Sequence, residues 1–182
     1  MSTDAPTANL ARILTWAVRR FPDREALRFE GRTWTYAELD AEVHTAAAAL
    51  RERGLGLGDR VVVLGPNLPE ILVLALGLAR VGGVLVPLNV RLHDDELVAL
   101  AQRAKPVGLV AAPDCADAAR AISAATPTLD WRVAIDGPIE VAGGGAAVGG
   151  ASGGHAVPAA AFERWDDFVA PGAGQHVPDA VL

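Results

Sequence analysis

The chain has 182 residues, which is enough for one domain with a hydrophobic core. Hydrophobic residues make up 51% of it, so we expect it to fold rather than remain disordered. The formal net charge of −6 argues against a nucleic-acid partner, which requires a basic face on the protein.

Cysteine use and the terminal sequence predict the compartment. Cys115 is the single cysteine, so no internal disulfide can form and a reducing environment fits. Asp4 and Arg12 interrupt the N-terminus, and no apolar signal-peptide core follows them. The longest apolar stretch is bounded by Glu70 and Arg80 and is too short to span a bilayer. We therefore expect a soluble cytoplasmic protein with no membrane span.

The N-terminal part predicts a helix, a hairpin and a second helix. The first helix runs from Ala8 to the stop at Pro22. Residues 26–29 and 33–35 read as the two strands of a β-hairpin. Thr35 and Glu38 have the spacing of a capping box, which begins a long helix. The apolar residues expected on one face of the first helix are Leu10, Ile13, Leu14, Ala17, Val18 and Phe21. The buried stripe expected on the second is Leu39, Val43, Ala46, Ala47 and Leu50.

The central stretch predicts a strand–helix–strand crossover. Residues 61–64 form a β-branched run without alternation, as expected for a strand buried on both faces. Asn67 and Glu70 suggest a second capping box before a helix over residues 71–79. Gly82 and Gly83 end this helix, and residues 84–86 form the next strand. A crossover of this length implies parallel strands.

The same alternation continues towards the C-terminus. Residues 94–104 predict a helix with four inward residues, namely Leu97, Val98, Leu100 and Ala101. Strands are expected over residues 107–111 and 131–135, and between them a helix capped by Asp114 extends to Ala125. Phe162–Val169 predicts one or two helical turns.

These elements predict an α/β fold with a doubly wound, mostly parallel sheet flanked by helices, preceded by an N-terminal helix and a β-hairpin. We expect residues 1–137 to form the α/β part. Residues 138–161 should form a flexible loop, because Gly143–Gly154 is almost entirely Gly, Ala and Ser. Residues 162–182 should form a short helix and a tail.

Two local patterns resemble ligand sites but favour a structural interpretation. The glycines of Gly54–Gly58 follow a helix and precede a strand, the reverse of a dinucleotide-binding loop, so they predict a helix end and turn. The acids of His93–Glu96 are consecutive and point in different directions. They suit a helix N-terminus better than a metal site.

The remaining chemistry-bearing residues also favour ordinary roles. Cys115 is expected to be a small, partly buried residue, although a helix N-terminus can lower the pKa of a thiol. His44 is expected to be a packed or boundary residue, whereas His155 and His176 carry no readable signal. The basic residues interpreted as solvated surface charges are Arg80, Arg91, Arg103 and Lys105.

Four segments in register resemble the adenylate-forming acid–CoA ligases. They are Thr35–Leu39 (TYAEL), Gly54–Val61 (GLGLGDRV), Asn67–Glu70 (NLPE) and Gly83–Asn89 (GVLVPLN). The resemblance covers roughly residues 8 to 136 and concerns scaffold motifs. It therefore implies the N-terminal part of the large domain of such a ligase.

The resemblance implies a function for an intact relative. That enzyme uses ATP and Mg²⁺ to convert a carboxylic or fatty acid to an acyl-adenylate, and then forms the thioester with coenzyme A. The family's phosphate loop follows an acidic, apolar lead-in, which Val177–Leu182 resembles. The loop itself, the adenine-binding segment, the hinge aspartate and the late lysine have no counterpart here.

The resemblance consequently assigns no catalytic, cofactor-binding or metal-binding residue to the chain. We expect a fragment that ends before the nucleotide loop, binds no ATP, Mg²⁺ or coenzyme A alone, and pairs with the remainder of a ligase or with itself. Two alternatives are a non-catalytic interaction module and an unrelated small-molecule-binding α/β domain. The sequence encoded after Leu182 distinguishes truncation from a stand-alone remnant.

Overall fold

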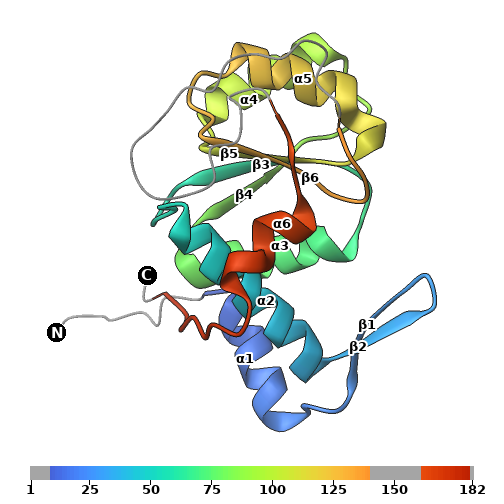
Figure 1. Cartoon of the computed structure of the whole chain (residues 1–182), viewed down its shortest axis with the longest axis vertical. Coiled ribbons are helices and arrows are strands. Elements are labelled where there is room, and N and C mark those ends of the chain that lie inside the picture. The colour runs from blue at the N-terminus through green and yellow to red at the C-terminus, as the bar shows by residue number, and fades with distance from the viewer. Residues whose placement is uncertain (1–8, 140–160, 181–182) are drawn as a thin grey trace, which may run out of the picture. The chain divides into compact units, whose positions relative to one another are not determined.

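The computed structural model describes residues 9–139 and 161–180 (Figure 1). Its helices are α1 (Ala11–Arg20), α2 (Tyr36–Glu52), α3 (Pro69–Val81), α4 (Asp94–Ala104), α5 (Ala116–Ala125) and α6 (Trp165–Val169), with 3₁₀ turns η1 (Pro113–Cys115) and η2 (Ala170–Gly172). Its strands are β1 (Glu25–Phe29), β2 (Arg32–Thr35), β3 (Arg60–Leu64), β4 (Val84–Pro87), β5 (Gly108–Ala111), β6 (Trp131–Ala134) and β7 (Glu163–Arg164).

The chain divides into two compact units. The helical unit comprises Met1–Asp59, Asn67–Val84 and Val169–Leu182, and the sheet unit comprises Arg60–Pro66 and Leu85–Phe168.

Helix α2 is the centre of the helical unit. The predicted capping box is confirmed, since Thr35 accepts a hydrogen bond from the Glu38 N–H and the Glu38 carboxylate accepts one from the Thr35 N–H. The predicted buried stripe of α2 is also confirmed. Ala46–Ala49 are nearly inaccessible, and this run of small side chains lets two glycines approach the helix. A Cβ on Gly77 of α3 would lie 3.4 Å from the Ala46 Cβ, and one on Gly172 would lie 2.1 Å from the Thr45 carbonyl oxygen.

The hairpin and the first helix complete the helical unit. Strands β1 and β2 form the predicted antiparallel hairpin. Their pairing has an irregularity between Glu25 and Leu27 that was not predicted. The predicted face of α1 is confirmed at Leu14 and Ala17 and wrong at Leu10 and Ile13. Ala11, Leu14 and Ala17 are buried, whereas Leu10, Ile13 and Trp16 are 54%, 64% and 63% exposed. The buried face follows the small residues that allow close helix packing, rather than the largest apolar side chains.

A parallel sheet organises the sheet unit. Its strand order is β4-β3-β5-β6-β7. The pairs β3–β5, β5–β6 and β6–β7 are parallel. Helices α4 and α5 pack against each other (Figure 1) and against the sheet through a common apolar core. Its members include Val62, Leu97, Leu109 and Ile122. The α/β class with a five-stranded parallel sheet and flanking helices is thus confirmed.

Strand β7 was missed by the sequence prediction. Two residues, Glu163 and Arg164, pair with Val133 and Ala134 of β6 before the chain turns into α6. The helical turns expected at the end of Phe162–Val169 are confirmed as α6. A two-residue strand carries no alternation, so its pairing comes from the neighbouring strand rather than from its own sequence.

Three local predictions in the crossovers are wrong. Asn67 does not cap α3. Leu68 is the N-cap, with an extended backbone of the kind that a following proline favours. Asp114 lies inside η1, and α5 begins only after Cys115. Leu100 of α4 is 40% exposed rather than inward, although Leu97 and Ala101 are buried.

Some predictions fall on other parts of the chain. The Gly143–Gly154 loop and His155 lie outside the described residues. The proposed boundaries at residues 137 and 161 stay predictions, as does the flexibility of residues 138–161.

We predict that Gly108→Ala destabilises the protein. A Cβ at this position in β5 would lie 2.2 Å from a ring carbon of Trp131, so the indole would have to leave its site. Overpacking of this kind costs about 1–3 kcal/mol. Thermal unfolding should show a clearly lower midpoint. Gly56→Ala is the matched control, because the nearest atom to its Cβ lies 3.8 Å away. Equal midpoints for the two variants would contradict the packing described here.

Candidate functional site

The structure places the two site-like sequence patterns in structural roles. Gly54 and Gly58 have φ of +78° and +82°, and the Gly56 N–H donates to Asp59 Oδ2 at 2.9 Å, so this segment is a helix end and turn as predicted. At the acidic cluster, Glu96 accepts a hydrogen bond from the His93 N–H at 3.1 Å and thereby begins α4. Within residues 9–139 and 161–180, no cluster of three or more His, Cys, Asp or Glu residues could hold a metal ion.

Cys115 lies beside a small acidic pocket of the sheet unit. The pocket has a volume of about 130 Å³. Its lining residues are Leu64, Val90, Asp94, Leu97, Asp114, Cys115, Asp117 and Ala118. Burial, and then the nearby Asp114 carboxylate, raise the pKa of the Cys115 thiol, which opposes nucleophilic activation. The expectation of a partly buried, ordinary cysteine is confirmed.

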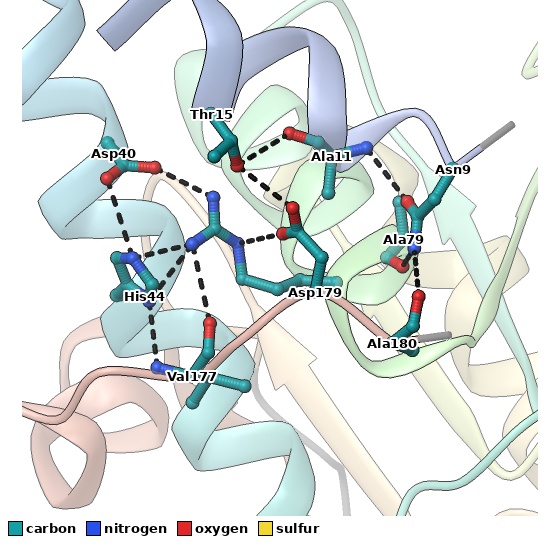
Figure 2. A network of polar contacts seen from close by, with 10 residues as sticks. Asn9, Ala11, Thr15, Asp40, His44, Ala79, Val177, Asp179 and Ala180 are labelled. Carbon is teal, nitrogen blue, oxygen red and sulfur yellow. Dashed lines mark hydrogen bonds and ion pairs between the residues drawn. The ribbon is translucent and has the colours of Figure 1, made fainter. Parts of the chain in front are cut away.

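The main concentration of buried polar groups lies in the helical unit, around Arg80 (Figure 2). Arg80 is only 2% exposed, so its prediction as a solvated charge is wrong. Its Nη2 donates to Asp40 Oδ1 of α2 at 2.7 Å. Its Nε faces Asp179 Oδ1 at 3.4 Å. Two carboxylates thus compensate one buried guanidinium, which satisfies the need of a buried charge for ionic partners.

His44 joins the same group. The residue is 8% exposed, which confirms a packed position. Its Nδ1 accepts a hydrogen bond from the Val177 N–H at 2.9 Å, and Arg80 Nη1 lies 3.1 Å from the same atom. Nε2 faces Asp40 Oδ2 at 3.5 Å. The His176 ring packs on the His44 ring with centroids 4.1 Å apart, a role that the sequence did not indicate.

The electrostatics keep His44 neutral. Burial, followed by the positive charge of Arg80, lowers the pKa of His44 below its ordinary value, and His176 acts in the same direction. The carboxylates of Asp40 and Asp179 oppose this shift. A neutral ring retains the lone pair on Nδ1 that the Val177 N–H requires.

The other contacts of this group hold the end of the described chain. Arg80 Nη1 donates to the Val177 carbonyl at 3.4 Å. The Thr15 hydroxyl of α1 donates to Asp179 Oδ2 at 3.0 Å. The Ala180 N–H donates to the carbonyl of Arg80 at 2.7 Å. Asn9 Nδ2 donates to the carbonyls of Ala79 and Ala180, at 2.8 and 3.2 Å (Figure 2). We call Val177–Ala180 the anchored segment, and the side chains that hold it the Arg80 network.

The contacts of this network are suited to binding a peptide segment. Its donors and acceptors are directed at the anchored segment and at one another. Its cation is neutralised by Asp40 and Asp179, both within ion-pair distance. Such an arrangement fixes a peptide segment in one course.

Sequence analysis could not identify the network because its members are far apart in the chain. Arg80 and Asp40 are 40 positions apart, and His44 and Val177 are 133 positions apart. One signal was available. Arg80 follows Val73 and Gly77 at helical spacing, on the buried face of an apolar helix. An arginine on such a face indicates a buried ion pair. The predictions that Arg91, Arg103 and Lys105 are exposed are confirmed.

Comparisons with known proteins agree with this fold. A family model described as AMP-binding enzyme matches residues 14–169, and the chain belongs to that family. A feruloyl-CoA synthase from Amycolatopsis is 41% identical over 114 residues, covering 60% of this chain and 23% of the synthase. A second relative is a Mycobacterium tuberculosis ligase named for a propanoyl group that bears a methyl-dioxo-octahydroindenyl substituent. It is 34% identical over 160 residues, covering 86% of this chain and 27% of the ligase. The chain thus spans about a quarter of the length of these relatives.

Solved structures give the same result for the fold. The anthranilate CoA ligase AuaEII, in complex with anthranoyl-AMP, superposes with a TM-score of 0.76 at 18% identity, covering 96% of this chain and 30% of that one. A long-chain-fatty-acid CoA ligase described as putative, from Rhodopseudomonas palustris, superposes with a TM-score of 0.72 at 25% identity. This match covers 95% of this chain and 38% of that one. The structural match is to part of each ligase. Across the described ranges, none of the helices is long and apolar enough to cross a membrane.

We predict that His44 makes stability fall on mild acidification. The lowered pKa of His44 means that the unfolded chain takes up a proton near its ordinary value of about 6.5 before the folded chain does. The contribution is fully present above that pH and decreases as the pH falls, by at most about 1.4 kcal/mol per pH unit. Melting midpoints between pH 7.5 and 5.5 should therefore depend less on pH in His44→Gln than in the wild type.

His93→Gln serves as the control for this experiment, since His93 is an exposed histidine in the sheet unit. Its pH profile should match that of the wild type. A His44→Gln profile parallel to the wild type would contradict the neutral, buried imidazole.

Proposed function

We propose that this chain is the N-terminal α/β part of an ATP-dependent, AMP-forming acid–CoA ligase. The observation that carries the proposal is the family match over residues 14–169, together with relatives named as acid–CoA ligases. The fold supports it, because nearly the whole chain superposes on one part of such ligases.

The reaction proposed for the whole enzyme has two steps. The carboxylate of an acid attacks the α-phosphorus of ATP, which gives an acyl-adenylate and releases pyrophosphate. The thiol of coenzyme A then attacks the acyl carbon and releases AMP. Mg²⁺ supplies positive charge to the phosphate oxygens in the first step. Relatives are named for feruloyl, hydroxybenzoyl and long-chain fatty acyl substrates, so the proposal extends to a carboxylic acid of unspecified type.

The residues described here do not fit the nucleotide. The acidic pocket of the sheet unit has three aspartates and no basic residue in its lining, so it would repel phosphates. Arg80, the one strongly buried cation within residues 9–139 and 161–180, already faces two carboxylates. We therefore derive no step through ATP, Mg²⁺ or coenzyme A at these residues. The contribution proposed for this chain is to fold the N-terminal scaffold and to hold the anchored segment.

We predict that the 182-residue chain alone gives no acid-dependent exchange of pyrophosphate into ATP. The 114 residues of the chain that match the Amycolatopsis feruloyl-CoA synthase should support exchange when they replace the matched segment of that synthase. The measurement uses labelled pyrophosphate with aryl, cinnamic-type and fatty acids. The synthase lacking its matched segment is the control. Exchange by the isolated chain, or a cooperatively folding chimera without exchange, would contradict the proposal.

We also propose that α1 contacts another part of a ligase, or a second copy of the chain. Leu10, Ile13 and Trp16 recur at spacing three and form an exposed apolar stripe. We predict that the isolated chain self-associates and that Ile13→Glu with Trp16→Glu weakens this association. Light scattering over a concentration series measures it, with Arg12→Glu as the charge control. A monomeric wild type at all concentrations would contradict the prediction.

A further inference from the structure

The anchored segment is held at both ends and in its middle by polar contacts, and Arg80 takes part at each of these places. At its start, the Val177 N–H donates to His44 and the Val177 carbonyl accepts from Arg80. In its middle, Asp179 contacts Arg80 and Thr15. At its end, Ala180 donates to the backbone of Arg80 and accepts from Asn9. A segment without helix or strand structure thus has a fixed course.

The holding groups come from three helices of the helical unit. Thr15 belongs to α1, Asp40 and His44 belong to α2, and Arg80 belongs to α3. Arg80 joins α2 to the segment, because its side chain meets Asp40, His44, Val177 and Asp179 while its carbonyl accepts from Ala180. Figure 2 shows the contacts from Asp40, His44, Val177 and Asp179 meeting at one guanidinium. The loss of this side chain therefore removes contacts at the start and in the middle of the segment together.

The preceding turn adds a steric constraint. A Cβ on Gly172 in η2 would lie 2.1 Å from the Thr45 carbonyl oxygen and 3.0 Å from Ala48, so the chain reaches the network along the surface of α2. Val177 is 3% exposed and therefore packed as well as hydrogen-bonded. The segment is thus specified by shape and by charge.

We propose that Arg80 is a positioning residue, which fixes the course of Val177–Ala180 and thereby places the nucleotide-binding chain that continues from this segment in the ligase. This inference rests on the proposed function and on the resemblance of Val177–Leu182 to the lead-in of the family's phosphate loop. Arg80 touches neither substrate nor nucleotide. It acts through the segment, so it should affect adenylation and leave thioester formation from a preformed acyl-adenylate unchanged.

Arginine is suited to this task in a way that lysine is not. Its planar guanidinium presents several N–H donors in fixed directions. Here Nη2 donates to Asp40 and Nη1 donates to the Val177 carbonyl, while Nε lies within ion-pair distance of Asp179. A lysine carries the charge but offers one ammonium group, so it can meet only part of this set. Arg80→Lys should therefore restore function partly and Arg80→Gln should not.

The first arm of the test measures the segment directly in the 182-residue chain. The rate of hydrogen exchange at the Val177 and Ala180 amides should rise at least about tenfold in Arg80→Gln. The reason is that their acceptors, His44 Nδ1 and the carbonyl of residue 80, are no longer held in place. Asp179→Asn and Thr15→Val are milder variants that retain the buried arginine. They should also accelerate hydrogen exchange at these two amides. The test can therefore be carried out with them even if Arg80→Gln fails to fold. Arg28→Gln, which removes an exposed ion pair with Glu25, is the matched control and should leave both amides unchanged.

The second arm measures the two half-reactions in the natural polypeptide that carries this chain. Misplacement of a binding element can reduce rates by up to about 100-fold, so Arg80→Gln and Asp179→Asn should lower kcat/KM for ATP in adenylation by about 10- to 100-fold. The kcat/KM for ATP of Arg80→Lys should lie between the values of these variants and that of the wild type. The rate of thioester formation from a synthetic acyl-adenylate and coenzyme A should stay within about twofold, whereas general misfolding would reduce both rates.

The outcomes separate this inference from the proposed function. A wild-type polypeptide without acid-dependent pyrophosphate exchange would overturn the proposed function. A wild type that exchanges, with variants that retain its kcat/KM for ATP or lose both half-reactions equally, would overturn the positioning role of Arg80. Unchanged amide exchange in every Arg80 and Asp179 variant would overturn it as well.

Discussion

The helical unit depends on the burial of one positive charge. The Arg80 guanidinium is almost completely removed from water, which is unfavourable unless ionic and hydrogen-bonding partners replace the solvent. Asp40 and Asp179 provide those partners from positions 40 residues before and 99 residues after it. Removing one partner of a buried pair typically costs about 3–5 kcal/mol. The same interaction therefore constrains how α2, α3 and the anchored segment pack together.

In the function proposed here, the described residues act as a scaffold, and this constraint holds the helical part of it together. The sheet unit has an apolar core and a small acidic pocket, in which the Cys115 thiol has a raised pKa. The helical unit places its buried polar groups against its own chain. Membership of the AMP-binding enzyme family and coverage of about a quarter of the ligases agree with such a division of roles. In the function proposed here, bond making belongs to residues beyond those described.

The fold could be predicted from the sequence where the signals are local, but the network could not. The Thr35–Glu38 capping box and the β-branched run of β3 act within a few residues, and both were read correctly. The α1 face was predicted correctly at Ala17 but not at Ile13, which is exposed, while the small residue Ala11, which was not predicted, is buried. Arg80 was taken for a surface charge because its partners lie at distant positions that no periodicity connects. His176 was unreadable for the same reason.

A double-mutant cycle between Arg80 and Asp179 tests the central claim most directly. The free energy of unfolding would be measured by urea titration for the wild type, Arg80→Gln, Asp179→Asn and the double variant. If the buried pair holds the anchored segment, the two substitutions should be coupled, with an interaction energy of about 1–3 kcal/mol. Additive effects, with coupling below about 0.3 kcal/mol, would show that the two side chains do not act together and would contradict the account.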